Sequence, residues 1–96
     1  MKIAAWRAGN KELRISFKDA TTCIELGEIL DVVRGRLGGR ILQQVEGPDA
    51  IVSLIEVEGV RAWLVCDDEL GIFLKGDPEL SEESLQALAE RIAVML

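Results

Sequence analysis

The sequence predicts an α+β fold, a two-layer sandwich in which a mainly antiparallel sheet carries two helices packed on one face. Three observations predict it: a strictly alternating apolar segment, two amphipathic segments with helical spacing, and turn residues between short β-like runs. Each amphipathic helix needs an apolar surface to cover, and an antiparallel sheet supplies one. The predicted order is ββ-α-ββββ-α, and the 96 residues suit a single domain spanning 1–96.

The first two strands are predicted to form a hairpin. Residues 13–18, LRISFK, alternate strictly between apolar and polar side chains, which is typical of a half-buried strand. Residues 2–8, KIAAWRA, are the predicted partner strand, and Gly9-Asn10 between the two runs tolerates positive φ. We therefore expect an antiparallel pair at the start of the chain.

The clearest helix is predicted to follow this hairpin. Thr22 and Glu25 match a capping box, in which each side chain bonds a free backbone N–H of the first turn. Gly38-Gly39 is expected to end the helix in a left-handed turn. Five apolar residues recur at helical spacing and form one stripe: Leu26, Ile29, Leu30, Val33 and Leu37.

Four strands and a second helix are predicted in the rest of the chain. The strands are residues 40–46, 50–57, 60–66 and 71–75, with a Gly47-Pro48-Asp49 turn after the first of them. The helix can begin at Asp77, with Pro78 in its first turn, or at Ser81. Its expected buried stripe is Leu85, Leu88, Ile92 and Met95, with Ala89 and Ala93 beside it.

The hairpin around Glu58-Gly59 allows two registers. A two-residue turn pairs Val57 with Val60, and it places Ile51, Ser53, Ile55 and Val57 on the face that the helices cover. A three-residue loop with glycine in a bulge pairs Glu56 with Val60 instead. Asn-Gly is the preferred two-residue turn, and Glu-Gly departs from it. In either register the face bearing Trp63 is rich in large apolar side chains.

This second apolar face is the candidate interaction face of the protein. In the two-residue register it contains Val52, Leu54, Trp63 and Val65. Two helices can cover only one face of a two-layer domain, so the other face needs a cover or stays exposed. The alternatives are a loop or hairpin of the same chain, a second copy in a homodimer, and a different protein.

Cysteine and histidine usage disfavours metal and nucleophilic chemistry. Cys23 and Cys66 stand in apolar segments, and we expect them to be reduced thiols that fill space in or near the core. The chain has no histidine and no pair of closely spaced cysteines, so neither a zinc site nor a histidine-activated nucleophile is expected. The prediction is therefore a protein without catalytic residues, metal or cofactor.

Two short segments are weaker candidates for chemistry. Asp67-Asp68-Glu69 could hold a metal or act in acid–base catalysis, but adjacent side chains on an extended chain diverge, so a polar turn is favoured. Arg34, Arg36 and Arg40 flank glycines and could bind an anion. They follow a helix C-terminus, where carbonyl groups point outward, so a helix stop is the favoured interpretation.

The central α-βββ-α order resembles the double-stranded RNA-binding domain in outline. The similarity is limited to topology. That family carries basic residues at the start of its last helix, whereas the corresponding residues here read DPELSEES. The net charge of −6 also disfavours nucleic acid, and no apolar run reaches the roughly 18 residues of a membrane span. The charged N-terminal residues are unlike a secretory signal, so a cytoplasmic location is expected.

The functional prediction is a small acidic cytoplasmic domain that acts as a non-enzymatic protein-interaction module. Its partner is predicted to be another protein or a second copy of the chain, with no nucleic acid and no membrane. The alternative is a small enzyme or a metal- or anion-binding protein that uses residues 67–69 or the segment from Arg34 to Arg40.

Overall fold

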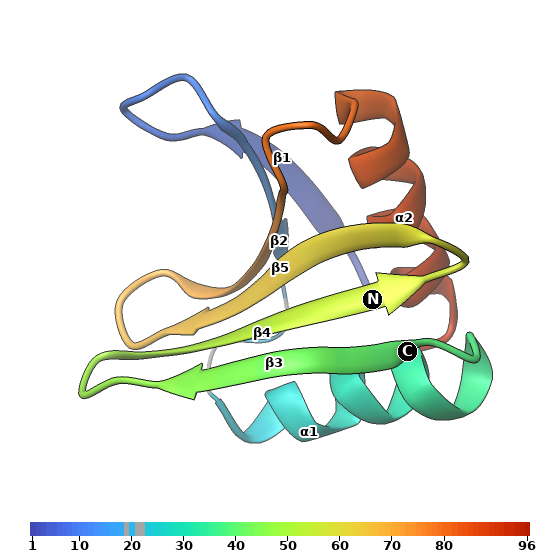
Figure 1. The fold of residues 1–96 in the computed structure, drawn as a ribbon. Helices are drawn as coiled ribbons and strands as arrows, with labels where there is room; N and C mark the ends of the chain where they lie inside the picture. The colour runs from blue at the N-terminus through green and yellow to red at the C-terminus, as the bar shows by residue number, and fades with distance from the viewer. Residues whose placement is uncertain (19, 21–22) are drawn as a thin grey trace.

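A computed structural model describes residues 1–18, 20 and 23–96, and it contains one six-stranded antiparallel sheet with helices on one side (Figure 1). The strand order is β1-β2-β6-β5-β4-β3. The strands are β1 (Ile3–Arg7), β2 (Leu13–Phe17), β3 (Arg40–Glu46), β4 (Ala50–Val57), β5 (Val60–Asp67) and β6 (Gly71–Gly76). The helices are α1 (Ile24–Asp31), the π-helical turn η1 (Val32–Arg36) that continues it, and α2 (Glu82–Val94). The predicted α+β class and the order ββ-α-ββββ-α are confirmed.

The hydrophobic core lies between the helices and one face of the sheet. Alternate strand residues point into it, among them Ile15 and Phe17 of β2, Ile55 of β4 and Leu64 of β5, all buried. α2 packs against β6, β2, β1 and β5, and η1 packs against β3. The sheet twists strongly, so that β1 and β2 run steeply across the direction of β3, β4 and β5 (Figure 1).

The β4–β5 hairpin has the two-residue turn. Val57 lies opposite Val60, Ile55 opposite Ala62 and Leu54 opposite Trp63. Glu58 and Gly59 both have positive φ, 51° and 80°, as a type I′ turn requires. The Glu58 carboxylate accepts hydrogen bonds from Arg91 Nη1 and Nη2 of α2, at 3.1 and 3.2 Å. Glu58 therefore forms the turn and also links it to α2.

The first helix ends in a wider turn than a regular α-helix. The Leu37 N–H donates to the Val32 carbonyl, five residues back, and the Gly39 N–H donates to the Val33 carbonyl. Gly38 has a φ of 64°, so the predicted left-handed stop is confirmed. The predicted capping box cannot be compared, because Thr22 lies outside the described residues.

Gly39 brings the end of this turn directly against β4. A Cβ on Gly39 would lie 2.6 Å from the backbone oxygen of Glu56 and 2.8 Å from Cγ2 of Val57. No side chain fits at that separation without a backbone shift. Glycine at this position therefore permits the close approach of the helix end to the sheet.

The second helix begins at the later of its two predicted starts. Ser81 is the N-cap, and its Oγ accepts a hydrogen bond from the Ser84 N–H at 3.1 Å. Leu85, Leu88 and Ile92 are buried as predicted. The prediction for Met95 is wrong: its side chain is 42% exposed, because the helix ends at Val94 and the chain leaves the core there.

Cys23 and Cys66 form a disulfide, so the prediction of two reduced thiols is wrong. Their Cα atoms lie 5.8 Å apart, although 43 positions separate them in the sequence. Cys66 points from β5 toward the helices and is fully buried, while Cys23 immediately precedes α1. The bond therefore ties the start of α1 to the middle of the sheet. Sequence spacing could not indicate this pair, because neither cysteine belongs to a local motif.

Candidate interaction face of the sheet

The candidate site is the open face, by which we mean the sheet side chains that point away from α1 and α2. The strand register places all four predicted residues on it, with Leu54 opposite Trp63 and Val52 opposite Val65. The neighbouring strands extend the same face, because Phe73 of β6 lies opposite Val65. The apolar residues of the open face are Trp6, Val45, Val52, Leu54, Trp63, Val65 and Phe73.

The middle of the open face is covered by its own large side chains. Val65 and Phe73 are buried, although both lie outside the main core. Trp6 packs its ring edge-to-face against Phe73, with ring centroids 5.6 Å apart. Trp63 is half-buried, and Val45 at the β3 edge is 51% exposed. The apolar surface that remains accessible therefore lies mainly over β4, β5 and the β3 edge.

The N-terminal hairpin contributes a cation and two aromatic rings to this face. The Arg14 guanidinium carbon lies 5.4 Å from the Trp6 ring centroid and 5.1 Å from that of Phe73. Arg14 Nε also lies 3.3 Å from Glu12 Oε1. The Trp6 indole N–H donates to Ser16 Oγ at 2.7 Å. Trp6, Arg14 and Phe73 were not among the predicted residues of this face, although the alternation of residues 13–18 places Arg14 opposite the core side.

The open face is rich in cations. Six of the eleven lysines and arginines of the chain belong to it, in the sheet register or by continuing its alternation: Lys2, Arg14, Lys18, Arg40, Arg61 and Lys75. The carboxylates placed there among the described residues are Glu12, Glu56 and Asp67. The acidic character of the whole chain therefore arises elsewhere, mainly on the helices and their flanking loops.

Glu56 forms ion pairs with two arginines at one end of the open face. It lies opposite both Arg40 of β3 and Arg61 of β5. Its Oε1 accepts from Arg40 Nη2, and its Oε2 accepts from Arg61 Nε at 2.9 Å. The hydrogen bonds from Arg40 and then Arg61 hold the pKa of Glu56 below its usual value of 4.5, because they favour the ionised form.

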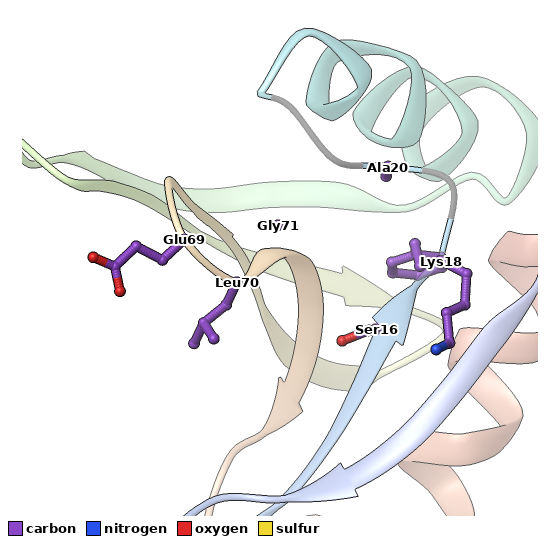
Figure 2. Close-up of a pocket in the computed structure, with 7 residues that line it drawn as sticks. Ser16, Lys18, Ala20, Glu69, Leu70 and Gly71 are labelled. Atoms are coloured by element: carbon purple, nitrogen blue, oxygen red, sulfur yellow. The ribbon is translucent and has the colours of Figure 1, made fainter.

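A pocket of about 260 Å³ opens where the end of β2 faces the β5–β6 turn. Ser16 and Lys18 extend into it from the β2 side, and Glu69 and Leu70 lie on the turn opposite (Figure 2). Figure 2 shows the Glu69 carboxylate directed away from Lys18, so the pocket does not join the two charges. Its lining also includes Phe17, Ala20 and Gly71, so the pocket has both polar and apolar walls.

The acidic stretch of residues 67–69 has the geometry of a turn. Asp67 Oδ1 accepts hydrogen bonds from the backbone N–H groups of Glu69 and Leu70, at 2.8 and 3.0 Å. Gly71 follows with a φ of 77°. The side chains of Asp68 and Glu69 are exposed. Among the described residues, no group of three cysteine, aspartate or glutamate side chains could hold a metal ion.

The three arginines of the candidate anion site do not converge. Arg34 of η1 pairs with Asp31 of α1 at 3.2 Å, on the helix side of the sheet. Arg40 pairs with Glu56 on the open face, on the other side of the sheet. Arg36 lines a separate groove with Leu37 and residues of α2. Arg34 and Arg36 belong to η1, whereas Arg40 begins β3. Gly38 and Gly39 turn the chain between these two elements, which separates the arginines.

That groove, of about 460 Å³, lies between η1 and α2 and is lined by Arg36, Leu37, Ala87, Glu90, Arg91, Val94 and Met95. This groove was not predicted from the sequence. The sequence carries one local signal for this groove: Val94 belongs to neither predicted stripe, which indicates that its side chain points outward. In the structure Val94 is 81% exposed.

Comparisons of this chain with known protein families, with curated protein sequences and with solved structures find no match. Within the described part of the chain, no helix is both long enough and apolar enough to cross a membrane.

Proposed function

We propose that this protein is a non-enzymatic protein-interaction module that binds its partner through the open face. One observation carries the proposal: both described helices pack on the same side of a six-stranded sheet, yet the other side bears large apolar residues. Trp63, Leu54 and Val52 are only half-buried there, and Val45 is exposed. Contiguous apolar surface of this kind marks interaction sites in soluble proteins.

The charges of the open face favour a different protein over a second copy. In a symmetric dimer the same patch is used by both copies, so two faces that each carry more cations than carboxylates would be brought together. Like charges brought together at an interface oppose association. A heterologous partner carries no such constraint, and it is the partner that we propose.

The experiment that tests the proposal places a photo-crosslinking residue, p-benzoylphenylalanine, at one of two exposed positions. Position 45 lies on the open face, and position 83 lies on the exposed side of α2. After irradiation in cells that express the protein, we expect an adduct of defined mass from position 45 and none of that mass from position 83. Intact-mass analysis then separates a second copy from a different protein.

A pair of matched substitutions makes the test specific to the face. Trp63→Glu places a charge among the half-buried apolar residues of the open face, and Val94→Glu places one at an exposed apolar position at the end of α2. We expect the position-45 adduct to be lost with Trp63→Glu and kept with Val94→Glu, with thermal unfolding showing that both variants fold. A folded Trp63→Glu variant that keeps the adduct would refute the proposal.

The proposed cytoplasmic location and the disulfide make opposite demands on the cysteines. A reducing cytoplasm keeps most thiols reduced, whereas Cys23 and Cys66 are bonded in the structure. Alkylation of free thiols in intact cells, followed by mass spectrometry, measures the oxidised fraction. A fully oxidised pair would count against a reducing compartment, and a reduced pair would support the cytoplasmic location.

A further inference from the structure

We propose that the partner presents an acidic segment to the open face, with carboxylates beside large apolar side chains. This inference rests on the proposed function and adds the chemistry of the partner. The charge of the chain is −6, so a basic partner would be the simple expectation. The structure reverses that expectation for this one face, because six cations and three described carboxylates gather there.

The centre of the open face holds two cations directly opposite each other. Arg14 of β2 lies opposite Lys75 of β6, and Lys75 in turn lies opposite Trp63 of β5. Like charges in directly opposed positions of an antiparallel pair destabilise the sheet. Glu12 lies beside Arg14, at 3.3 Å, but no described carboxylate pairs with Lys75. A carboxylate supplied by a partner would offset this repulsion.

A second pair of like charges stands at one end of the same face. The Lys18 N–H donates to the Lys2 carbonyl at 2.8 Å, which continues the β1–β2 ladder by one step and sets these two lysines opposite each other. Both side chains are exposed. The apolar residues of β4 and β5 therefore lie between Arg40 and Arg61 at one end and these lysines toward the other, so that a partner needs both apolar and acidic groups.

Nucleic acid fits the face less well than an acidic protein segment. Bases bind such sheets by stacking on open aromatic rings. Here the Arg14 guanidinium lies over the rings of both Trp6 and Phe73, and Phe73 is buried. The charge of the whole chain is −6, which also disfavours a long polyanion. An acidic protein segment can be short enough to contact only the open face.

The test uses a phage-displayed library of random 16-residue peptides as the probe. Wild-type protein selects peptides from the library, and the folded Trp63→Glu variant removes those that bind elsewhere. We expect the enriched peptides to combine several aspartates or glutamates with aromatic or aliphatic residues. Enrichment of neutral or basic peptides, or no enrichment dependent on Trp63, would overturn the inference.

The best peptide is then synthesised and titrated against the protein by tryptophan fluorescence. The chain has two tryptophans, Trp6 and Trp63, and both lie on the open face, so the signal reports binding there. We expect Lys75→Gln to weaken binding about two- to fivefold, as for one exposed ion pair. Arg36→Gln, a cation beside α2, should leave binding unchanged. Rising salt should weaken binding, because it screens the charges.

Three results would contradict the inference. The first is equal binding by a version of the peptide in which glutamine replaces every acidic residue. The second is tighter binding of a single-stranded oligothymidylate than of the peptide. The third is a fluorescence change with protein concentration alone, which would identify a second copy as the occupant. If the position-45 adduct still depends on Trp63 in any of these cases, the proposed function survives and only the acidic partner is wrong.

Discussion

Glu56 shows at the scale of a single residue how charge is arranged on the open face. Two guanidinium groups, from strands on either side of β4, bind its two oxygens, and its side chain is only 15% exposed. The pairing of Glu56 with Arg61 follows from the two-residue register of the β4–β5 hairpin, which is the register that the structure has. The contribution of Arg40 could not be predicted, because it depends on which strand lies on the other side of β4.

The lowered pKa of Glu56 predicts a loss of stability in acid. Its folded-state pKa lies below 4.5, so unfolding takes up a proton as the pH falls through that range. The stabilisation is therefore full above about pH 4.5 and disappears as the pH falls through the lower folded value. We expect Glu56→Gln to be less stable than wild type at pH 7, with the difference shrinking at pH 3. Urea unfolding at both pH values measures it.

Glu83→Gln is the control for this experiment, because Glu83 is exposed and forms no ion pair with a described residue. Its free energy of unfolding should follow that of wild type at both pH values. A constant difference between wild type and Glu56→Gln across the pH range would contradict the assignment of the shift to Arg40 and Arg61.

The close approach of Gly39 to β4 predicts that a larger side chain at this position destabilises the fold. In Gly39→Ala the new Cβ would lie 2.6 Å from a backbone oxygen of β4, and backbone cannot move aside cheaply. We expect the free energy of unfolding to fall by about 1–3 kcal/mol. In Gly35→Ala the new Cβ meets nothing within 4 Å, so that variant should be neutral or up to about 1 kcal/mol more stable. Equal stability of the two variants would show that η1 does not approach β4 closely.

At the scale of elements, local signals predicted the strands and the left-handed stop of the first helix. The alternation in β2, the stripes of α1 and α2 and the turn at Glu58-Gly59 all depend on neighbours within a few residues. The π-helical turn η1 was not predicted, because the sequence around Gly35 is compatible with regular helix. The turn at the first hairpin also differs, since Lys11, with a φ of 68°, takes the positive φ expected at Gly9-Asn10.

The start of α2 predicts a capping effect. Ser81 Oγ accepts from the Ser84 N–H, which satisfies one of the free backbone groups of the first turn. Ser81→Ala should lower the free energy of unfolding by about 1 kcal/mol. Ser84→Ala keeps its backbone N–H and the acceptor at Ser81, and should cost less. Chemical denaturation of both variants tests this, and a Ser84→Ala loss as large as that of Ser81→Ala would contradict the capping role.

At the scale of the whole molecule, the disulfide is the longest-range covalent constraint described. It closes a loop across a sequence separation of 43 and joins the start of α1 to β5. A cross-link of this span restricts the unfolded chain and so favours the folded state. The loop includes β3 and β4, and therefore much of the open face.

Reduction of the disulfide should destabilise the whole fold. For a loop of this length, the chain-entropy account gives a loss of about 4 kcal/mol in the free energy of unfolding. Urea unfolding with and without a phosphine reductant measures it, with intact mass confirming the redox state. The double variant Cys23→Ala/Cys66→Ala should not respond to the reductant. Unchanged unfolding of the reduced wild-type protein would mean that the bond adds no stability.

The sequence by itself determined the order of the elements and most of the residues that face the core, and it limited the β4–β5 hairpin to two registers, between which the structure decided. These follow from periods of 2 and 3.6 residues and from turn geometry, which act between close neighbours. It also identified Val52, Leu54, Trp63 and Val65 as residues of one face. Their role in binding stays a prediction.

Only the tertiary structure decided which distant segments meet. It set β6 between β2 and β5, joined Cys23 to Cys66, separated Arg40 from Arg34, and gathered cations from β2, β3, β5 and β6 on one face. The charge of a face is the sum of the charges on several strands, and packing determines which strands lie side by side. Composition reports only the total, which is why an acidic chain can present a basic surface.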